Sequence, residues 1–340
     1  MSSTASIRPF IHFGEHSYSG RFTDKLVKLL GAEPRLPAGP VTQWHMDLAY
    51  AVQSEIEEAA CRLVRWAVQE TGISTVCLGG GVAQNVKMNS AIFAMDEVSD
   101  VFAHPLCSDS GAAAGAALVT CFRETGAHPL PLATLALGPE ESSAAIRASL
   151  CNAKVAFEQP ADVFAMTARA LADGLLVGWV DGRAEAGPRA LGQRSILADP
   201  RAVESRDTVN AVVKQRELWR PFAPAMLASA RDRYFDKSTD SRFMTMAFRA
   251  NAALRRDAPA IVHSDGTSRI QTVHPDVTPA FHRLIQEFAG MTGVPVLLNT
   301  SFNIRGEPIV NTTEDALRTF WATGLDMLVL GAEFVVRKEG

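Results

Sequence analysis

Residues 182–195 read GRAEAGPRALGQRS and follow an apolar run, residues 175–180, that we expect to form a short buried strand. The charged residues of the stretch are three arginines and one carboxylate: Arg183, Arg189, Arg194 and Glu185. Guanidinium groups match phosphate and carboxylate oxygens, and glycine lets the backbone approach a ligand closely. By itself the stretch is consistent with an anion-binding loop or with a salt-bridged surface turn.

Three later segments add groups that suit an anionic ligand. Residues 214–224 contain one lysine and two arginines, residues 263–269 contain a histidine and an arginine around an Asp-Gly turn, and residues 299–303 follow another apolar run. The side chains concerned are Lys214, Arg216, Arg220, His263, Arg269, Asn299, Ser301 and Asn303. Four such segments close together predict a polyanionic, nucleotide-like ligand.

The four segments resemble the C-terminal half of the O-carbamoyltransferases of antibiotic and nodulation-factor biosynthesis. The motifs are GRxExGPRALGxRS, KxRExxRPFAP, HxDGTxRxQTV and NTSFNxxGEPIV, which occur here at 182–195, 214–224, 263–273 and 299–310. Their order and spacing fit, and the resemblance extends from about Tyr50 to Val336. The chain is identified on these motifs as a member of that family.

The resemblance implies an α/β protein with two domains. Residues 1–150 would form a partial actin-like (ASKHA) domain, and residues 151–340 a YrdC-like domain with a twisted sheet. The YrdC-like domain would join carbamoyl phosphate to ATP, giving carbamoyl adenylate, and the ASKHA domain would transfer the carbamoyl group to a hydroxyl of a natural product or sugar. The implied enzyme is a cytoplasmic carbamoyltransferase of biosynthesis.

The pattern of apolar residues agrees with an α/β fold because helical and strand-like segments alternate after residue 160. We expect helices at 47–71, 162–172, 203–213, 278–291 and 313–323, and strands at 74–78, 175–180, 294–298 and 325–330. Prolines and a Gly-Pro pair predict that residues 127–160 form an inter-domain connection without a long element.

The resemblance also assigns roles in the second domain. Four cations would hold the phosphate and carbamoyl groups and offset developing charge: Lys214, Arg189, Arg220 and Arg269. Substrate contacts would come from Asn299, Ser301, Asn303, His263, Arg194 and Arg216. For three of these a structural role is the alternative: His263 can fix the turn at Asp265, and Arg194 and Arg216 can pair with Glu185 or Glu217.

In the first domain, residues 79–85 read GGGVAQN between an expected strand and helix, which suits either phosphate binding or a tight turn. The resemblance assigns nucleotide contacts to Gly79, Gly80, Gly81 and Asn85. It assigns a metal ligand to Asp109, which could instead be a helix N-cap. His12 and His16 are four residues apart, a spacing that on a helix would present both to a metal. Because Gly14 lies between them and Pro9 lies just upstream, we prefer to interpret them as exposed loop histidines. The implied cofactors are ATP with Mg²⁺, and Fe²⁺ or another divalent metal at the ASKHA site.

The composition limits the classes of partner that this chain is expected to bind. The net charge of −4 argues against a general nucleic-acid binder. The five cysteines show no CxxC spacing, and no apolar run is long enough to predict a membrane span or a signal peptide. We therefore expect carbamoyl phosphate and a hydroxyl-bearing small molecule as partners, with no membrane and no nucleic acid.

Two alternatives stay open. Members of the resembling family are longer and begin with a first half of the ASKHA domain that supplies the metal's histidines. This chain could therefore be one part of a split enzyme that forms carbamoyl adenylate and needs a partner chain for transfer. It could also be a YrdC-like enzyme that makes threonylcarbamoyl adenylate for tRNA modification, although the GPRALG and RPFAP motifs favour the O-carbamoyl family.

Overall fold

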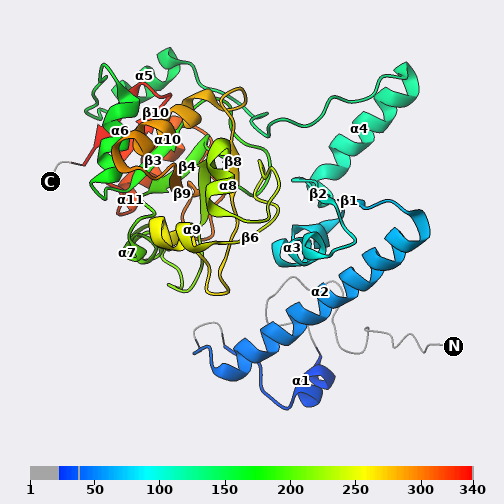
Figure 1. The fold of residues 1–340 in the computed structure, drawn as a ribbon. Helices are drawn as coiled ribbons and strands as arrows, with labels where there is room; N and C mark the ends of the chain where they lie inside the picture. Colours follow the sequence, from blue (N-terminus) through cyan, green and yellow to red (C-terminus); the bar gives the residue numbers. More distant parts are fainter. Residues whose placement is uncertain (1–22, 37–38, 339–340) are drawn as a thin grey trace. The chain divides into compact units, whose positions relative to one another are not determined.

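The computed structural model describes residues 23–36 and 39–338, and helices and strands alternate along them (Figure 1). The chain divides into two compact units after Glu58, which lies inside α2 (Gln43–Thr71). The first unit holds α1 (Asp24–Leu30) and the beginning of α2. Every strand described below belongs to the second unit, so the predicted sites in the described residues lie in that unit as well.

The second unit begins with a small parallel pair of strands. β1 (Thr75–Leu78) and β2 (Asp100–Ala103) pair in parallel, and α3 (Val86–Ala94) connects them and packs on β2. A 3₁₀ turn, η1 (Gly81–Gln84), leads into α3, and residues 109–125 form α4 (Asp109–Thr125). The strand expected at 74–78 and the helix expected after residues 79–85 are confirmed.

A seven-stranded mixed sheet forms the centre of the second unit. Its strands are β3 (Val177–Val180), β4 (Arg194–Ala198), β5 (Ala223–Leu227), β8 (Gln271–Val273), β9 (Val296–Ser301), β10 (Met327–Leu330) and β11 (Phe334–Arg337). They lie in the order β11-β10-β3-β4-β9-β5-β8, with β10–β3 and β5–β8 parallel and the other neighbours antiparallel. The α/β class is therefore confirmed, and three of these strands had been expected from apolar runs.

The helices around this sheet begin and end where the sequence provides caps. α6 (Val163–Ala172) follows Asp162, whose carboxylate accepts the N–H groups of Phe164 and Ala165. α10 (Pro279–Thr292) starts with proline and ends at Gly293, which has a φ of 75°. α11 (Thr313–Ala322) begins with a capping box. α10 packs against α6, β5 and β9, and α11 against α5 (Ser143–Asn152), β3 and β10.

Several short elements complete the unit. They are α7 (Val203–Thr208), the π-helix η2 (Val209–Val213), η3 (Ala228–Ala230), α8 (Arg231–Tyr234), α9 (Ala252–Asp257), η4 (Pro259–Ile261), and the antiparallel pair β6 (Phe248–Arg249) and β7 (Thr267–Ser268). The helix expected at 203–213 is present but changes from α to π partway. Among the helices of the described ranges, none has both the length and the apolar character that a membrane crossing requires.

Residues 127–160 are more than the open connection that their prolines predicted. They contain α5, and Leu135 is 3% exposed in a cluster with Leu191, Ala223 and Phe243. Burying apolar side chains against another segment is favourable, so the segment packs onto the sheet domain despite its prolines. A domain boundary at residue 150 would fall inside α5. The division into ASKHA-like and YrdC-like domains stays a prediction.

Candidate functional site: a cationic cavity

The loop between β3 and β4 is held in shape by one carboxylate. Glu185 Oε1 accepts three backbone N–H groups, from Leu191, Gln193 and Arg194, at 2.8, 2.9 and 3.0 Å. Hydrogen bonds to a charged acceptor are stronger than neutral ones, so this set fixes the second half of the loop against its first half. Glu185 therefore shapes the loop.

Arg194 begins β4 and is 1% exposed. Its guanidinium donates to four backbone carbonyls, at 2.9–3.3 Å, those of Asp181, Gly182, Gln193 and Asn311. Burial lowers the pKa of Arg194, and the carboxylate of Glu185 acts in the opposite direction. Arg194 was predicted to contact substrate, but the structure places it in the wall behind the loop, where it lines none of the cavities described below.

Arg189, five residues earlier, lies at a cavity of about 100 Å³ that we call the arginine cavity. Its lining residues are Pro188, Arg189, Ala190, Arg216, Pro221, Phe222, Ala223, Met244, Arg269, Asn299, Thr300 and Ser301. All four motifs contribute to this list. Every charged residue in it is an arginine, so the structure brings together cations from separate motifs around one space.

Burial disfavours the charge on each arginine of this cavity, and Arg269 is further disfavoured by the charges of the other two. Burial, then the charges of Arg189 and Arg216, lower the pKa of Arg269 to about 9. Burial and Arg220 lower the pKa of Arg216 to about 10, and burial alone lowers that of Arg189. Within the described part of the chain, Arg189 and Arg269 make no hydrogen bond or ion pair, and Arg269 Nε is shielded from water. An anion in the cavity would relieve this repulsion.

Arg216 is the arginine of this cavity whose guanidinium is held in place by neighbouring side chains. Its Nε donates to Asn210 Oδ1 at 2.7 Å, and its guanidinium lies 4.6 Å from the ring centroid of Phe222. Nη2 also donates to the carbonyl of Pro221, at 3.4 Å, so these contacts use two of the five donors and one face of the guanidinium plane. Arg216 thus has a fixed plane with donors left for a ligand.

A second cavity, of about 220 Å³, adjoins the first through Arg216 and Ser301. We call it the lysine cavity, and its lining is Lys214, Arg216, Arg220, Ser301, Asn303, Ile304, Arg305 and Gly306. The described residues that line this cavity include no carboxylate. Glu217 is close by, with its Oε2 at 3.0 Å from Arg220 Nε, and both side chains are partly exposed. Arg305 was not predicted; it lies inside the fourth motif, directly before a glycine, where its charge could have identified it.

Lys214 lies between these groups at the end of the π-helix. Its ammonium donates to Ser301 Oγ at 3.2 Å, to Asn303 O and Oδ1 at 3.0 and 2.8 Å, and to Ser301 O. Burial and the neighbouring charge of Arg216 lower the pKa of Lys214 to about 7. The next residue, Gln215, has a φ of 46°, which L-residues seldom adopt. Strain of this kind is often found at functional sites.

His263 makes the contacts expected for its structural alternative, which was to fix the turn at Asp265. Its Nδ1 lies 3.2 Å from Thr267 Oγ1, and its backbone N–H donates to the carbonyl of Thr267 at 2.8 Å. Asp265 accepts from the same threonine, at 2.9 Å from N and 2.7 Å from Oγ1, and forms an ion pair with Lys87 at 3.1 Å. Burial lowers the pKa of His263. The histidine fixes the turn and lines neither cationic cavity.

The glycine-rich loop after β1 is open. Gly79, Gly80 and Gly81 are exposed, and a Cβ at any of them would meet no atom within 4 Å. Asn85 caps α3 by accepting the N–H of Met88 at 3.1 Å. None of these four lines the cationic cavities. Their neighbours Gln84 and Val86 line a third, small cavity of about 20 Å³, which also includes Arg189.

A metal site does not form from the residues that the structure describes. Asp109 is exposed at the first turn of α4. Residues 23–36 and 39–338 contain no group of three or more His, Cys, Asp or Glu side chains that could hold a metal ion. His12 and His16 lie outside the described residues. Asp109 alone does not fit a metal, and we derive no chemical step through one.

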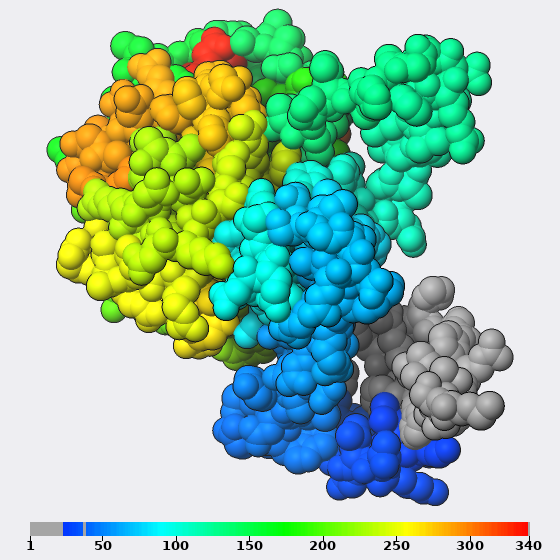
Figure 2. Space-filling model, turned by 45° about the vertical axis from the view of Figure 1, so that its right-hand side comes forward, coloured from blue at the N-terminus to red at the C-terminus, as the bar shows by residue number. Residues whose placement is uncertain are grey.

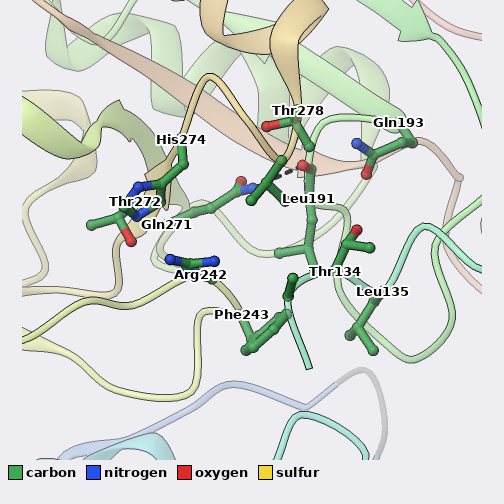
Figure 3. A pocket seen from close by; sticks show the side chains of 12 residues that line it. Thr134, Leu135, Leu191, Gln193, Arg242, Phe243, Gln271, Thr272, His274 and Thr278 are labelled. Atoms are coloured by element: carbon green, nitrogen blue, oxygen red, sulfur yellow. Dashed lines mark hydrogen bonds between the residues drawn. The ribbon is translucent and has the colours of Figure 1, made fainter. Parts of the chain in front are cut away.

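Asn299, on β9, belongs to a chain of amides that ends in the arginine cavity. Its Nδ2 donates to the carbonyl of Ala190 at 3.2 Å and to Gln271 Oε1 at 3.1 Å. Gln271 Nε2 in turn donates to the carbonyl of Leu191 at 2.8 Å, the bond drawn dashed in Figure 3. Both amides are buried, and Asn299 Oδ1 has no hydrogen-bond partner in the part of the chain that the structure describes. Gln271 was not among the predicted site residues, although it lies in the third motif.

Comparisons with known proteins agree with the motifs. Residues 168–338 match the family model Carbamoyltransferase C-terminus, and residues 21–118 match Carbamoyltransferase N-terminus. Nodulation protein NolO of Bradyrhizobium diazoefficiens is 40% identical over 308 residues, which are 88% of this chain and 56% of NolO. Nodulation protein NolNO of Sinorhizobium fredii is 37% identical over 332 residues, 96% of this chain and 48% of its own length.

A third relative has an enzymatic name. The 3'-hydroxymethylcephem-O-carbamoyltransferase of Amycolatopsis lactamdurans is 34% identical over 278 residues, which are 78% of this chain and 50% of that protein. The chain thus spans about half the length of the curated relatives it matches.

Proposed function

Because the chain belongs to the carbamoyltransferase family, we propose that its two cationic cavities bind carbamoyl phosphate and ATP and that carbamoyl adenylate forms there. The arginine cavity is the observation that carries this proposal. It gathers three guanidinium groups around one space without a carboxylate in the lining. Carbamoyl phosphate and the phosphates of ATP repel one another, so fixed cations are what their joint binding requires.

The proposed reaction uses one water and balances as follows. Water removes the phosphoryl group of carbamoyl phosphate, giving carbamate and inorganic phosphate. A carbamate oxygen then attacks the α-phosphorus of ATP, and pyrophosphate leaves. In the arginine cavity, Arg189, Arg216 and Arg269 would hold the phosphate and carbamoyl oxygens. In the lysine cavity, Lys214, Arg220 and Arg305 would bind the nucleotide phosphates, the last two from more open positions.

The second half of the proposal is transfer to a hydroxyl of a small molecule, a natural product or a sugar. It is supported by the family and by the name of the cephem relative, which specifies a hydroxymethyl acceptor. The glycine-rich loop after β1 and the first turn of α4 would serve this step. The small cavity that Arg189 shares with Gln84 adjoins that loop.

The test of adenylate formation is pyrophosphate release. The purified chain is incubated with ATP, Mg²⁺ and carbamoyl phosphate, and pyrophosphate and phosphate are measured together. We expect equal amounts of both, and release that stops when carbamoyl phosphate is omitted. Threonine with bicarbonate should not replace carbamoyl phosphate; if it does, the threonylcarbamoyl alternative is correct. Absence of release above background would refute the proposal.

One surface favours a second candidate, in which this chain activates the donor and a partner polypeptide completes transfer. α4 carries no charged residue from Ser110 to Phe122, yet nearly all its residues are exposed, and its teal atoms are open to view in Figure 2. A helix that is apolar on all sides is normally buried. We propose that it packs against a polypeptide equivalent to the part of NolO that this chain does not match.

A carbamoyl-transfer assay distinguishes the two candidate functions. The chain is mixed with carbamoyl phosphate, ATP and a hydroxyl acceptor, with and without the unmatched part of NolO. Transfer only in the mixture supports the partner requirement, whereas transfer by the chain alone refutes it. Pyrophosphate release by the chain alone is expected in both cases.

A further inference from the structure

We propose that Gln271 is a positioning residue that turns the carbonyl oxygen of Asn299, and not its amino group, toward the arginine cavity. The consequence is selectivity: the cavity accepts an acyl phosphate whose acyl group carries N–H donors and discriminates against one that carries a methyl group. This inference rests on the proposed function and adds to it the feature that recognises the donor's acyl group.

The orientation of both amides follows from two backbone carbonyls. Ala190 O and Leu191 O are consecutive in the loop between β3 and β4, and a carbonyl can only accept. Leu191 O therefore requires the NH₂ group of Gln271, which leaves Gln271 Oε1 pointing at Asn299. Ala190 O and Gln271 Oε1 then both require the NH₂ group of Asn299.

No other arrangement satisfies these four groups. Turning Asn299 over would place its oxygen against two acceptors, Ala190 O at 3.2 Å and Gln271 Oε1 at 3.1 Å from the present nitrogen. Turning Gln271 as well would place its oxygen against Leu191 O, which lies 2.8 Å from its nitrogen. Amide orientations are assigned from their partners, and here backbone atoms that cannot change roles decide both.

In this arrangement the NH₂ groups of both amides and Gln271 Oε1 are hydrogen-bonded, whereas Asn299 Oδ1 is not. Asn299 is 1% exposed and lines the arginine cavity. Its Oδ1 is shielded from water and accepts no hydrogen bond from residues 23–36 or 39–338. A buried acceptor without a partner is unfavourable, and such atoms are uncommon in folded proteins. The charged side chains around it are all donors, which suit oxygens of a ligand but not its N–H groups.

Carbamoyl phosphate presents the matching pattern. Its phosphate and carbonyl oxygens accept from the arginines, and its NH₂ group can donate to Asn299 Oδ1. Acetyl phosphate has nearly the same shape but carries a methyl group there, so Oδ1 would stay unpaired beneath it. A site built to hydrogen-bond a substrate N–H rejects the analogue that lacks it more strongly than a difference in size would allow.

Gln193 lies beside Gln271 and offers a matched control for its substitution. Figure 3 shows Gln271 and Gln193 lining the same small pocket, which also includes Leu191. Gln193 is buried as well, at 8% exposed. Its side chain makes no hydrogen bond to any residue that the structure describes, and it does not line the arginine cavity. Gln193→Leu therefore repeats the chemical change of Gln271→Leu without touching Asn299.

The experiment measures binding, so that it does not depend on catalysis. Dissociation constants of carbamoyl phosphate and acetyl phosphate are determined by calorimetric titration for the full chain, Gln271→Leu and Gln193→Leu. We expect the unchanged chain and Gln193→Leu to prefer carbamoyl phosphate by about 10²-fold. In Gln271→Leu the NH₂ group of Asn299 loses one of its two acceptors and keeps only Ala190 O, so the amide is held less firmly. The preference should then fall at least tenfold, mainly through weaker binding of carbamoyl phosphate.

The ratio of the two constants separates positioning from general damage. A purely structural role of Gln271 would weaken both ligands alike, and an unchanged ratio in Gln271→Leu would overturn the inference. If Gln271→Leu does not fold, as thermal unfolding would reveal, Gln271→Met offers an unbranched apolar replacement with the same expected ratio. Equal binding of both ligands by the unchanged chain also overturns it, even with normal pyrophosphate release. Selective binding without pyrophosphate release would refute the proposed function and leave this inference standing.

Discussion

Two glycine-containing loops of this chain follow strands, and they differ in what surrounds them. Residues 79–85, after β1, are open, and their three glycines have no neighbouring atoms where side chains would lie. Residues 182–195, after β3, are fixed by Glu185 and Arg194 and packed against the sheet domain. The packed loop nevertheless leaves the Arg189 side chain without a hydrogen bond or ion pair to any described residue. A pattern of glycines thus shows only that the backbone can turn. A candidate binding site forms where the surrounding packing leaves charged side chains without protein partners.

The largest expected effect tests how tightly the second loop is packed. Gly192 has a φ of 104°, and a Cβ there would lie 2.2 Å from Cδ1 of Phe281 in α10. Gly192→Ala combines backbone strain with overpacking, which together destabilise by on the order of 4 kcal/mol. We expect little folded protein and a strongly lowered Tm in thermal unfolding. A Tm near that of the unchanged chain would mean that the loop is as open as residues 79–85.

The next effect separates two arginines of one loop. Arg189→Ala should lower the rate of pyrophosphate release by about 10²-fold, because it removes a preorganised donor from developing charge. Arg183→Ala is the matched control, since Arg183 is exposed and donates to the carbonyls of Leu137 and Gly138. We expect its rate to stay within about twofold of the unchanged chain. Equal rates for the two variants would place Arg189 outside the reaction.

The pH dependence of binding tests the charge balance of the lysine cavity. Burial and Arg216 lower the pKa of Lys214 to about 7, so the free protein loses this charge as pH rises from 7 to 9. An anion needs the protonated form, and its dissociation constant should therefore rise with pH, approaching tenfold per unit. The measurement is calorimetric titration with ATP, whose phosphates the lysine cavity is proposed to bind. Lys214→Met should bind more weakly and with no such rise; the same rise in Lys214→Met would assign the proton to another group.

The smallest effect belongs to the open loop. Gly80 has a φ of 82°, so Gly80→Ala introduces backbone strain, but its Cβ would meet nothing within 4 Å. We expect a loss of about 1–2 kcal/mol that is confined to this loop and lowers the Tm slightly. Pyrophosphate release should be unchanged because Gly80 lines neither cationic cavity. A large loss of pyrophosphate release would show that the two loops act in the same step.

The sequence predicted most of the elements that apolar patterns can reveal. β1, β3, β9 and β10 are apolar runs, and α2 and α10 have helical spacing. β4 escaped detection because it begins with a buried arginine, Arg194, inside a motif that suggested a loop. The role of residues 127–160 also escaped, because prolines predict interruption but not the tertiary packing of Leu135.

Site residues were predictable as a group but not one by one. Charge and motif order indicated five of the six cations that line the two cavities and missed Arg305. They could not indicate that Arg194 would be used by backbone carbonyls, or that His263 would hold a turn, since both depend on which partners the fold supplies. Gln271 escaped for the same reason, because its importance lies in a contact with Asn299, 28 residues away.

The most direct test of the account is detection of the proposed product. The chain is incubated with ATP, Mg²⁺ and ¹³C-labelled carbamoyl phosphate, and the nucleotides are analysed by mass spectrometry. We predict labelled carbamoyl adenylate, matched by pyrophosphate, from the unchanged chain and from Arg183→Ala, and almost none from Arg189→Ala. Pyrophosphate released without label in any nucleotide, or labelled adenylate formed equally by Arg189→Ala, would contradict the claim that the arginine cavity activates the carbamoyl group.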